Sequence, residues 1–296
     1  MRILSLLLAA MTLPTLLCAD EPAPIAKTDS ITIDGALDEA CWKSAQPVRV
    51  DYLNSKQGVL SDEPRMTVRY AYDDHYLYLG YETFDKNLVA VATGKSQGPE
   101  GNARPGCEIY KDGVKVDVAE FFISFGDPHY FWELHHNAAN QFNDVWCVVA
   151  EPKSLLDKST TAMYGIVFCH EEFLKDEEIY KTAMGVKLKP KADGTPSTLN
   201  DDTDVDTGYT AELRLPWLAL GAPAEARTFI TDPPASPSEK PKRRAGPWKM
   251  SGRNLQILAV AQDGDLAERY HHSSPTRKGD WFHKTQPLWP EYQLKP

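Results

Sequence analysis

The sequence predicts an all-β protein, an antiparallel β-sandwich with short helical turns and long loops. Short segments in which apolar and polar residues alternate recur from residue 31 to residue 258. Turn-forming residues separate them, and few stretches show the 3.6-residue period of a helix. We expect residues 20–296 to form one domain, because nothing between them reads as a linker.

The clearest patterns lie near the N-terminus. Residues 31–45, ITIDGALDEACWKSA, predict a short strand, a tight turn at Asp34-Gly35 and one helical turn that presents Trp42. Residues 66–85, MTVRYAYDDHYLYLGYETFD, alternate, break at Asp73-Asp74 and alternate again. This second pattern predicts a β-hairpin with an acidic tip.

Later segments continue the alternation. The predicted strands are residues 116–125, 130–136, 145–149, 165–169, 185–188, 209–215 and 255–261. Three segments between them are predicted as loop insertions, near residues 94–113, 189–208 and 231–247. We expect no β-ladder in the last of these, because its prolines have no N–H to donate.

The first nineteen residues have the form of a secretory signal peptide, with Arg2, an apolar run and a cleavage point after Ala19. We therefore expect export to the periplasm or the extracellular space. Lipid attachment at Cys18 is the less favoured alternative, because Leu17 stands where a small residue is wanted. No other run is long and apolar enough to predict a membrane-spanning helix.

The net charge limits the possible partners, and the cysteine content limits the possible disulfides. The formal net charge of −10 disfavours nucleic acid as a partner, because the chain would repel the phosphates. The four cysteines outside the signal peptide permit two disulfides with three pairings, and buried free thiols are the alternative. They are Cys41, Cys107, Cys147 and Cys169.

The order of motifs along residues 30–296 resembles the family 9 carbohydrate-binding module. Residues 31–45 and 66–85 resemble its opening, and DVAEFFISFGD (117–127) with YFWELHHNAAN (130–140) resembles its central strands. GYTAELRLPWLALG (208–221) is similar to its strand and Pro-Trp turn, and residues 248–254 and 280–289 to its late segments. The resemblance implies an immunoglobulin-like or DOMON-like sandwich, non-catalytic sugar binding between two Trp rings, and structural calcium.

Sugar binding needs flat aromatic rings and polar groups for the hydroxyls. Trp146 and Trp281 are the candidates for the ring pair, because polar residues surround them in the sequence. Trp42 and Trp217 are predicted to be core, Trp132 is ambiguous, and Trp248 and Trp289 are weaker candidates. The candidates for hydroxyl contacts are His136, Asn137, Asn140, Asn143, Arg253 and His271. A turn of polar residues is the alternative interpretation of each.

Calcium has several weak candidates. Asp202, Asp204 and Asp206 alternate as at the start of a calcium loop, but Thr207 stands where an EF-hand has Gly. Asp73 and Asp74 at the hairpin tip, or Asp117 with Glu120, are alternatives.

We expect an exported, non-catalytic carbohydrate-binding protein that serves polysaccharide degradation or uptake, since no catalytic motif is present. One alternative is a haem b-binding electron-transfer module of the related DOMON-like sandwich. Its axial ligands would come from Met163, Met184, Met250 and the His135-His136 and His271-His272 pairs. Another is a hydrolase accessory without sugar affinity of its own.

Overall fold

The structure is a computed structural model. It describes residues 21–53, 59–90, 95–97, 103–105, 110–111, 114–127, 130–148, 164–166, 183–234, 236, 238, 240–266, 270–275 and 288–296. For residues 95–115, 143–148, 164–166, 243 and 245 within these ranges, only the backbone is described. The predicted signal peptide and Cys18 lie outside the described residues.

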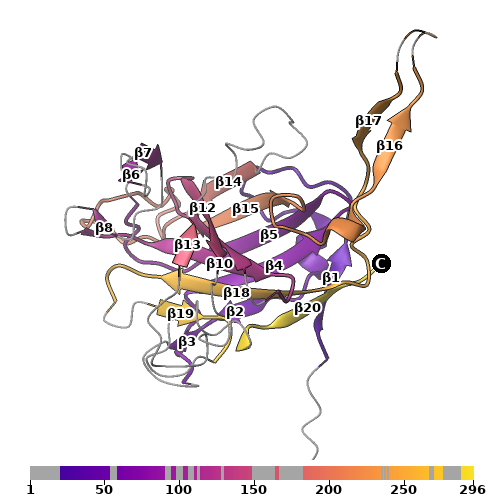
Figure 1. The fold of residues 1–296 in the computed structure, drawn as a ribbon. Coiled ribbons are helices and arrows are strands. Elements are labelled where there is room, and N and C mark those ends of the chain that lie inside the picture. The colour runs from indigo at the N-terminus through magenta and orange to yellow at the C-terminus, as the bar shows by residue number, and fades with distance from the viewer. Residues whose placement is uncertain are drawn as a thin grey trace, which may run out of the picture.

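Fourteen of the described strands form one sheet, which folds over itself into two layers (Figure 1). The strand order is β13-β12-β11-β10-β18-β20-β1-β4-β5-β15-β14. The β10 layer holds β3 (Tyr52–Leu53), β10 (Val118–Ser124), β11 (Tyr130–His136), β12 (Phe142–Val148), β13 (Tyr164–Ile166), β18 (Asn254–Gln262), β19 (Tyr270–His272) and β20 (Glu291–Leu294). The β5 layer holds β2 (Val48–Val50), β4 (Met66–Tyr72), β5 (Tyr76–Thr83), β14 (Ala183–Leu188) and β15 (Tyr209–Pro216).

Strand β1 (Ala23–Lys27) joins the two layers at one edge. It pairs parallel with β20 on one side and parallel with β4 on the other. The remaining pairings within the two layers are antiparallel, as predicted. The purely antiparallel expectation therefore fails at β1, whose sequence, APIAK, carries no signal of strand direction.

The facing sides of the two layers form one apolar core. Val68, Leu79 and Tyr81 of the β5 layer and Phe121 and Ile257 of the β10 layer are all fully buried in it. Burying side chains of this size contributes about 1.5–3 kcal/mol each. The alternation read from the sequence is thus the alternation between this core and the outer faces, and the predicted β-sandwich is confirmed.

The predicted hairpin at residues 66–85 is confirmed as β4 and β5. The two acidic residues at its tip form hydrogen bonds and an ion pair that stabilise the turn. The Asp73 carboxylate accepts the backbone N–H groups of His75 and Tyr76 and the hydroxyl of Tyr78. Asp74 forms an ion pair with Lys27 at 2.6 Å.

The predicted helical turn is helix α1 (Ala40–Ser44), and Trp42 is buried. The predicted strand at residues 31–33 is wrong, because this segment joins no ladder. Instead Ile31 packs against Trp42 and the following turn is tied to Glu212 on β15. Gly35 has φ 86°, and a Cβ there would come within 2.6 Å of the Val186 backbone.

All seven later strand predictions coincide with strands, at β10, β11, β12, β13, β14, β15 and β18. Where the described bounds differ from the prediction, the shift is one to three residues, and the predicted strand ends at residues 149 and 167–169 lie outside the described residues. The 3₁₀ helix η4 (Ala224–Ala226) follows β15. Within the described residues, no helix is long and apolar enough to cross a membrane.

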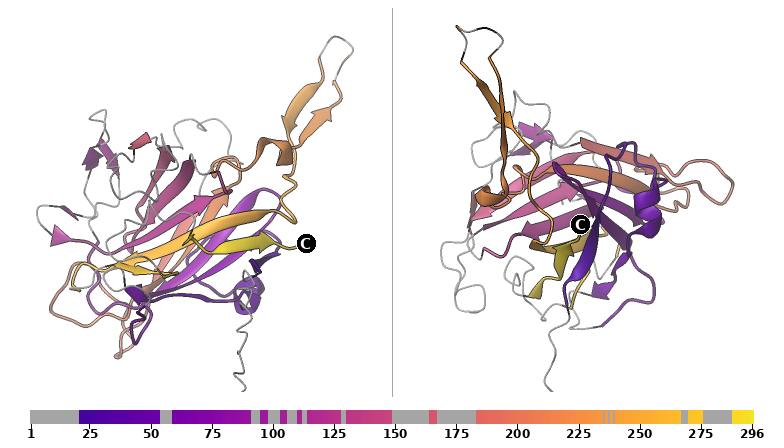
Figure 2. Two further views of the ribbon diagram at one scale, coloured as in Figure 1. Left: turned by 60° about the horizontal axis from the view of Figure 1, so that its bottom comes forward. Right: turned by 90° about the vertical axis from the view of Figure 1, so that its right-hand side faces the viewer.

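Two of the predicted loop insertions carry strands. Residues 94–113 include β6 (Lys95–Gln97), β7 (Ala103–Pro105) and β8 (Tyr110–Lys111), and β9 (Val114–Lys115) follows. The expectation of no ladder at residues 231–247 is wrong, because β16 (Phe229–Asp232) pairs with β17 (Lys242–Ala245). The prolines lie outside the paired residues, so no ladder N–H is missing. This hairpin projects away from the sandwich (Figure 2).

The structure shows for one of the four cysteines whether it is a free thiol or part of a disulfide. Cys41 is a free, partly buried thiol, and burial raises its pKa. Cys107 and Cys169 lie outside the described residues, and only the backbone of Cys147 is described. Pairing among those three stays open.

Candidate functional site

Three residues predicted to contact sugar hydroxyls lie together at the β11–β12 turn. His136 is fully buried on the core side, where its Nδ1 shares a hydrogen bond with the Tyr81 hydroxyl at 2.5 Å. Its Nε2 bonds to Asn140 Oδ1 at 2.9 Å. The Asn137 carboxamide oxygen accepts the backbone N–H groups of Ala139 and Gln141. In this structure the side chains of His136, Asn137 and Asn140 therefore hold the turn.

Arg253 lies at the opposite end of the sheet. Its guanidinium donates to Glu225 at 2.8 Å and to the Lys249 carbonyl at 3.1 Å. Ala261 on β18 pairs with Ala119, which in turn pairs with His136. Eight residues of strand separate positions 253 and 261, or about 26 Å at 3.3 Å per residue. One monosaccharide cannot contact both Arg253 and the β11–β12 turn.

Five of the seven tryptophans are buried: Trp42, Trp132, Trp217, Trp248 and Trp289. The core assignment of Trp42 and Trp217 is confirmed. The backbone of Trp146 pairs with that of Trp132, but its side chain is not described, and Trp281 lies outside the described residues. A sugar clamp made by Trp146 and Trp281 stays a prediction. The same holds for Asn143, whose side chain is not described.

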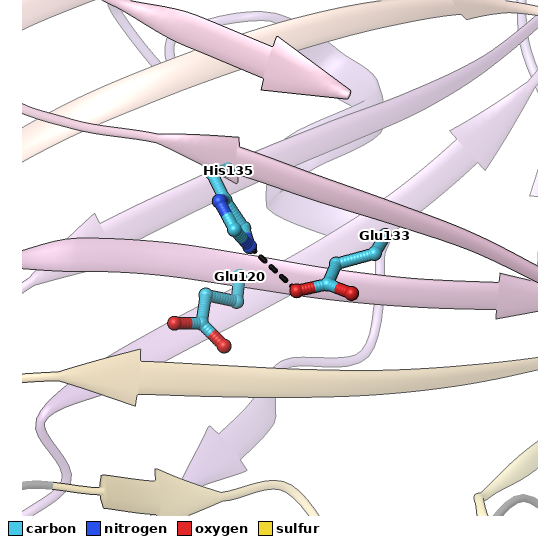
Figure 3. A group of neighbouring side chains, drawn as sticks. All are labelled: Glu120, Glu133 and His135. Carbon is cyan, nitrogen blue, oxygen red and sulfur yellow. Dashed lines mark hydrogen bonds and ion pairs between the residues drawn. The ribbon is translucent and has the colours of Figure 1, made fainter. Parts of the chain in front are cut away.

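The outer face of the β10 layer carries a group of buried polar side chains, which we call the outer-face cluster: Glu120, Glu133 and His135. Glu120 on β10 stands directly opposite His135 on β11, and Glu133 precedes His135 by two residues. Paired residues, and residues two apart on one strand, project from the same face. One ligand atom from each of the three lies within 4.8 Å of the others (Figure 3).

The cluster is buried and charged. Glu120 is 0% exposed, and His135 Nε2 bonds to Glu133 Oε1 at 2.8 Å. Burial lowers the pKa of His135, but the Glu133 hydrogen bond and the charges of Glu133 and Glu120 outweigh this and raise it. With His135 protonated, two carboxylates still face one cation.

Aromatic rings adjoin the cluster on the same face. Phe122, Phe131 and Trp289 pack together with Leu258 and Val260, apart from the main core. The Phe131 and Trp289 rings meet edge to face, with centroids 5.1 Å apart. His272 pairs with Val260, which in turn pairs with Glu120. This face thus combines buried aromatic rings with hydrogen-bonding groups.

Sequence reasoning named His135 only as a possible haem ligand and did not name Glu133, although a signal for both on one polar face was present. Polar residues at alternate positions of an otherwise apolar strand, as in FWELHH, indicate one polar face. Adjacent residues of a strand project to opposite faces, so the His135-His136 pair divides between the two faces of the β10 layer. His136 joins the core side and His135 the outer face.

A second group, the aspartate cluster, consists of Asp85, Asp117 and Asp263 at one end of the sandwich. Ligand oxygens of the three lie within 4.8 Å of one another. Arg65 donates to Asp263 and lies 3.7 Å from Asp85, as the one cation in this group among the described residues. Burial, and then the charge of Asp85, raise the pKa of Asp117 to about 7.

The aspartate cluster lines a small cavity together with Arg65 and Gln262. The buried Oε1 atom of Gln262 has no hydrogen-bond partner among the residues that the structure describes. Carboxylate and carboxamide oxygens are the ligands that calcium prefers, so this donor set fits the ion.

The acids that the sequence favoured for calcium lie outside the aspartate cluster. Asp204 pairs with Lys191 at 2.5 Å, and Asp206 accepts the backbone N–H groups of Leu88 and Thr198. Among the described residues, the groups of three or more metal-ligating side chains are the two clusters above. Asp73, Asp74, Asp202, Asp204 and Asp206 belong to neither.

The ligands proposed for the haem alternative do not converge on a site in the described residues. Met250 is buried in the core, Met184 packs against the core, and Met163 lies outside the described residues.

No protein-family model and no curated protein matches the chain. Solved structures do. A proposed carbohydrate-binding protein from Bacteroides uniformis is similar over 92% of this chain and 98% of its own, with a TM-score of 0.54 and 14% identity. This similarity shows that the two chains share a fold.

Two further structures are of a family 9 carbohydrate-binding module from Caldicellulosiruptor kristjanssonii. The complex with cellotriose has a TM-score of 0.45 and 14% identity, and covers 92% of this chain and 93% of that one. The complex with glucose has a TM-score of 0.44 and 13% identity, and covers 92% and 95%.

Proposed function

We propose that this protein is a non-catalytic carbohydrate-binding protein of the family 9 type, and that the outer-face cluster forms the polar part of its sugar site. The observation that carries the proposal is the burial of Glu120, Glu133 and His135 on a face that the apolar core does not use. Buried charges cost free energy unless they are paired. Such groups concentrate at functional sites.

The chemistry of the cluster suits sugar hydroxyls. Carboxylates accept hydrogen bonds, and hydrogen bonds to charged groups contribute about 1.5–3 kcal/mol each. The neighbouring Phe122, Phe131 and Trp289 rings are buried in this structure, so stacking on the pyranose C–H groups is assigned to Trp146 and Trp281 and not to them. The shared fold with a proposed carbohydrate-binding protein supports this assignment.

The remaining elements of the proposal rest on the sequence. Trp146 and Trp281 would clamp the sugar ring. Residues 1–19 would direct export to the periplasm or the extracellular space, where the protein would serve polysaccharide degradation or uptake.

A matched pair of variants tests the site. We expect Glu133→Gln to weaken binding of the best ligand from a glycan array by about tenfold or more, which corresponds to at least 1.4 kcal/mol. Arg253→Gln, at the far end of β18, should change the affinity by less than about twofold. Calorimetry on both variants decides. Full affinity in Glu133→Gln, or a large loss in Arg253→Gln, would place the sugar elsewhere.

We also propose that the aspartate cluster holds calcium, through the carboxylates of Asp85, Asp117 and Asp263 and the carboxamide oxygen of Gln262. The bound ion would supply structural cross-linking between the chain segments that carry these acids, and no chemistry. A ligand that binds only the folded state raises its stability. We expect calcium to raise the Tm of the wild type above its value in chelator, and Asp263→Asn to abolish the shift. An equal Tm in calcium and chelator would remove the ion from the proposal.

A further inference from the structure

The β16–β17 hairpin is an arm that stands clear of the sandwich (Figures 1 and 2). We call residues 229–245 the arm. In the part of the chain that the structure describes, β16 and β17 pair only with each other and form a separate two-stranded sheet. Phe229 is 43% exposed and Ile230 is 36% exposed. The arm therefore presents apolar side chains and backbone edges to solvent.

The arm is fixed at its base. Gly246 donates its N–H to the Thr228 carbonyl at 2.9 Å, and the Thr228 hydroxyl donates to the Pro247 carbonyl at 2.5 Å. Above the base, Arg244 pairs with Asp232 at 2.9 Å. An exposed ion pair contributes about 1 kcal/mol or less. A lone two-stranded hairpin is at best marginally stable in water, so the arm would gain most from a surface to rest on.

The charge of the arm is opposite to that of the rest of the chain. Residues 229–245 contain four basic residues, Lys240, Lys242, Arg243 and Arg244, against Asp232 and Glu239. Their net charge is +2, which leaves −12 for the remainder of a chain whose total is −10. The arm therefore suits an anionic surface that also offers apolar contact.

A surface of that kind exists on the protein itself, at residues 189–208, which we call the acidic loop. Val205 in this loop is 65% exposed, the most exposed of the large apolar side chains in the described residues. Asp202, three residues earlier, is exposed, and Asp201 is half-buried. The buried Asp206 carboxylate and the Lys191–Asp204 pair hold the loop in shape.

The arm cannot reach the acidic loop of its own chain. The loop precedes β15 and the arm follows it, and the eight residues of β15 span about 26 Å. The views of Figures 1 and 2 place the arm and the β14–β15 connection at opposite ends of the molecule. A contact between them joins two molecules head to tail, which is a heterologous interface.

We propose that the arm docks on the acidic loop of a second copy of this chain. Ile230 covers Val205, and Lys242, which lies on the same face of the hairpin as Ile230, faces Asp201 and Asp202 together with Lys240. The interface is small, so the association is weak, reversible and sensitive to salt. It is separate from the sugar site and does not depend on the proposed function.

Sedimentation velocity on the full chain tests the proposal. At about 0.1 M salt, where the Debye length is about 10 Å, the weight-average sedimentation coefficient should rise with protein concentration. At about 1 M salt, where the Debye length is about 3 Å, the rise should vanish. A concentration-independent monomer at low salt would overturn the proposal.

Charge reversal identifies the two surfaces. An arm-reversed variant (Lys240→Glu with Lys242→Glu) and a loop-reversed variant (Asp201→Lys with Asp202→Lys) should each stay monomeric alone. Mixed in equal amounts they should associate again, because each arm then meets a loop of opposite charge. The matched control, Lys43→Glu with Lys249→Glu, reverses two exposed lysines outside the arm and should associate as the wild type does. Equal Tm values would show that all four proteins are folded. A mixture that stays monomeric, or an arm-reversed variant that still associates, would overturn the proposal.

Discussion

Glu212 shows how one buried residue joins distant parts of the chain. Its Oε1 accepts the indole N–H of Trp42 at 2.8 Å, and its Oε2 accepts the backbone N–H groups of Asp34 and Gly35 at 2.9 Å each. The carboxylate thus binds helix α1 and the turn before it to β15. Burial raises the pKa of Glu212 and the three hydrogen bonds lower it, with a net rise.

Removing this carboxylate should cost much more than removing an exposed one. Glu212→Ala leaves three donors without their acceptor, and each unsatisfied buried group costs about 1–3 kcal/mol. We expect a loss of at least about 3 kcal/mol in the free energy of unfolding, measured by denaturant titration. The control is Glu291→Ala, since Glu291 is exposed and bonds only to Asn254 in the described contacts, and its loss should stay below about 0.5 kcal/mol. Similar losses in the two variants would show that Glu212 does not join these segments.

His136 predicts a loss of stability in acid. Burial lowers its pKa from 6.5 to about 4, against the opposing effect of the hydrogen bond that its Nε2 donates to Asn140 Oδ1. Between these two values the unfolded chain binds a proton that the folded protein does not, so stability falls as the pH falls from about 6.5 to about 4. Burial, and then the charge of His271, lower the pKa of His272 to about 3, which adds a loss of the same sign.

The variant His136→Gln isolates this effect. Gln does not titrate, so its free energy of unfolding relative to the wild type should improve steadily as the pH falls through that window. Denaturant titration at several pH values measures the difference. A constant difference between pH 7 and pH 4 would contradict the assignment of a neutral buried imidazole.

At the scale of elements, helix α1 contributes a buried side chain to the fold, whereas the arm does not. Trp42 of α1 is buried against the β5 layer, whereas Phe229 and Ile230 of the arm are exposed. Thr228 and Gly246 at the arm's base are already hydrogen-bonded, so a two-residue turn between them closes the gap.

Replacing residues 229–245 by Asn-Gly should therefore leave the free energy of unfolding within about 0.5 kcal/mol of the wild type, because no core contact is lost. The same deletion should abolish head-to-tail association. Denaturant titration and sedimentation velocity on one preparation measure both. A large loss of stability would mean that the arm belongs to the fold and not to an interface.

Sequence patterns predicted the strands better than they predicted which strands pair. Alternation located β4, β5, β10, β11, β15 and β18, because each has one face in the core. It missed β1, a five-residue strand whose parallel partners are β4 and β20, far along the chain. It also excluded a ladder at residues 231–247 from their proline content, although the prolines fall outside the paired positions.

The candidate site was only partly predictable for a related reason. His136, Asn137 and Asn140 are close in sequence, so they stood out, and the structure places them in one turn. Glu120 and Glu133 come together only through the register of β10 with β11. Register follows from which residues enter the core, and that is a property of the folded sandwich.

At the scale of the whole molecule, the two layers put different chemistry at different places. The outer face of the β10 layer holds the outer-face cluster, and one end of the sandwich holds the aspartate cluster. The arm projects away from the sandwich. This separation should allow the proposed sugar binding, calcium binding and self-association to be altered one at a time.

The most direct test of the central claim is a crystal structure of the protein soaked with its best oligosaccharide from a glycan array. We predict a sugar ring on the outer face of the β10 layer, with hydroxyls within hydrogen-bond distance of Glu120 or Glu133. Clear density for the sugar beside Arg253, or at the Asn137–Asn140 turn with that face unoccupied, would contradict the account.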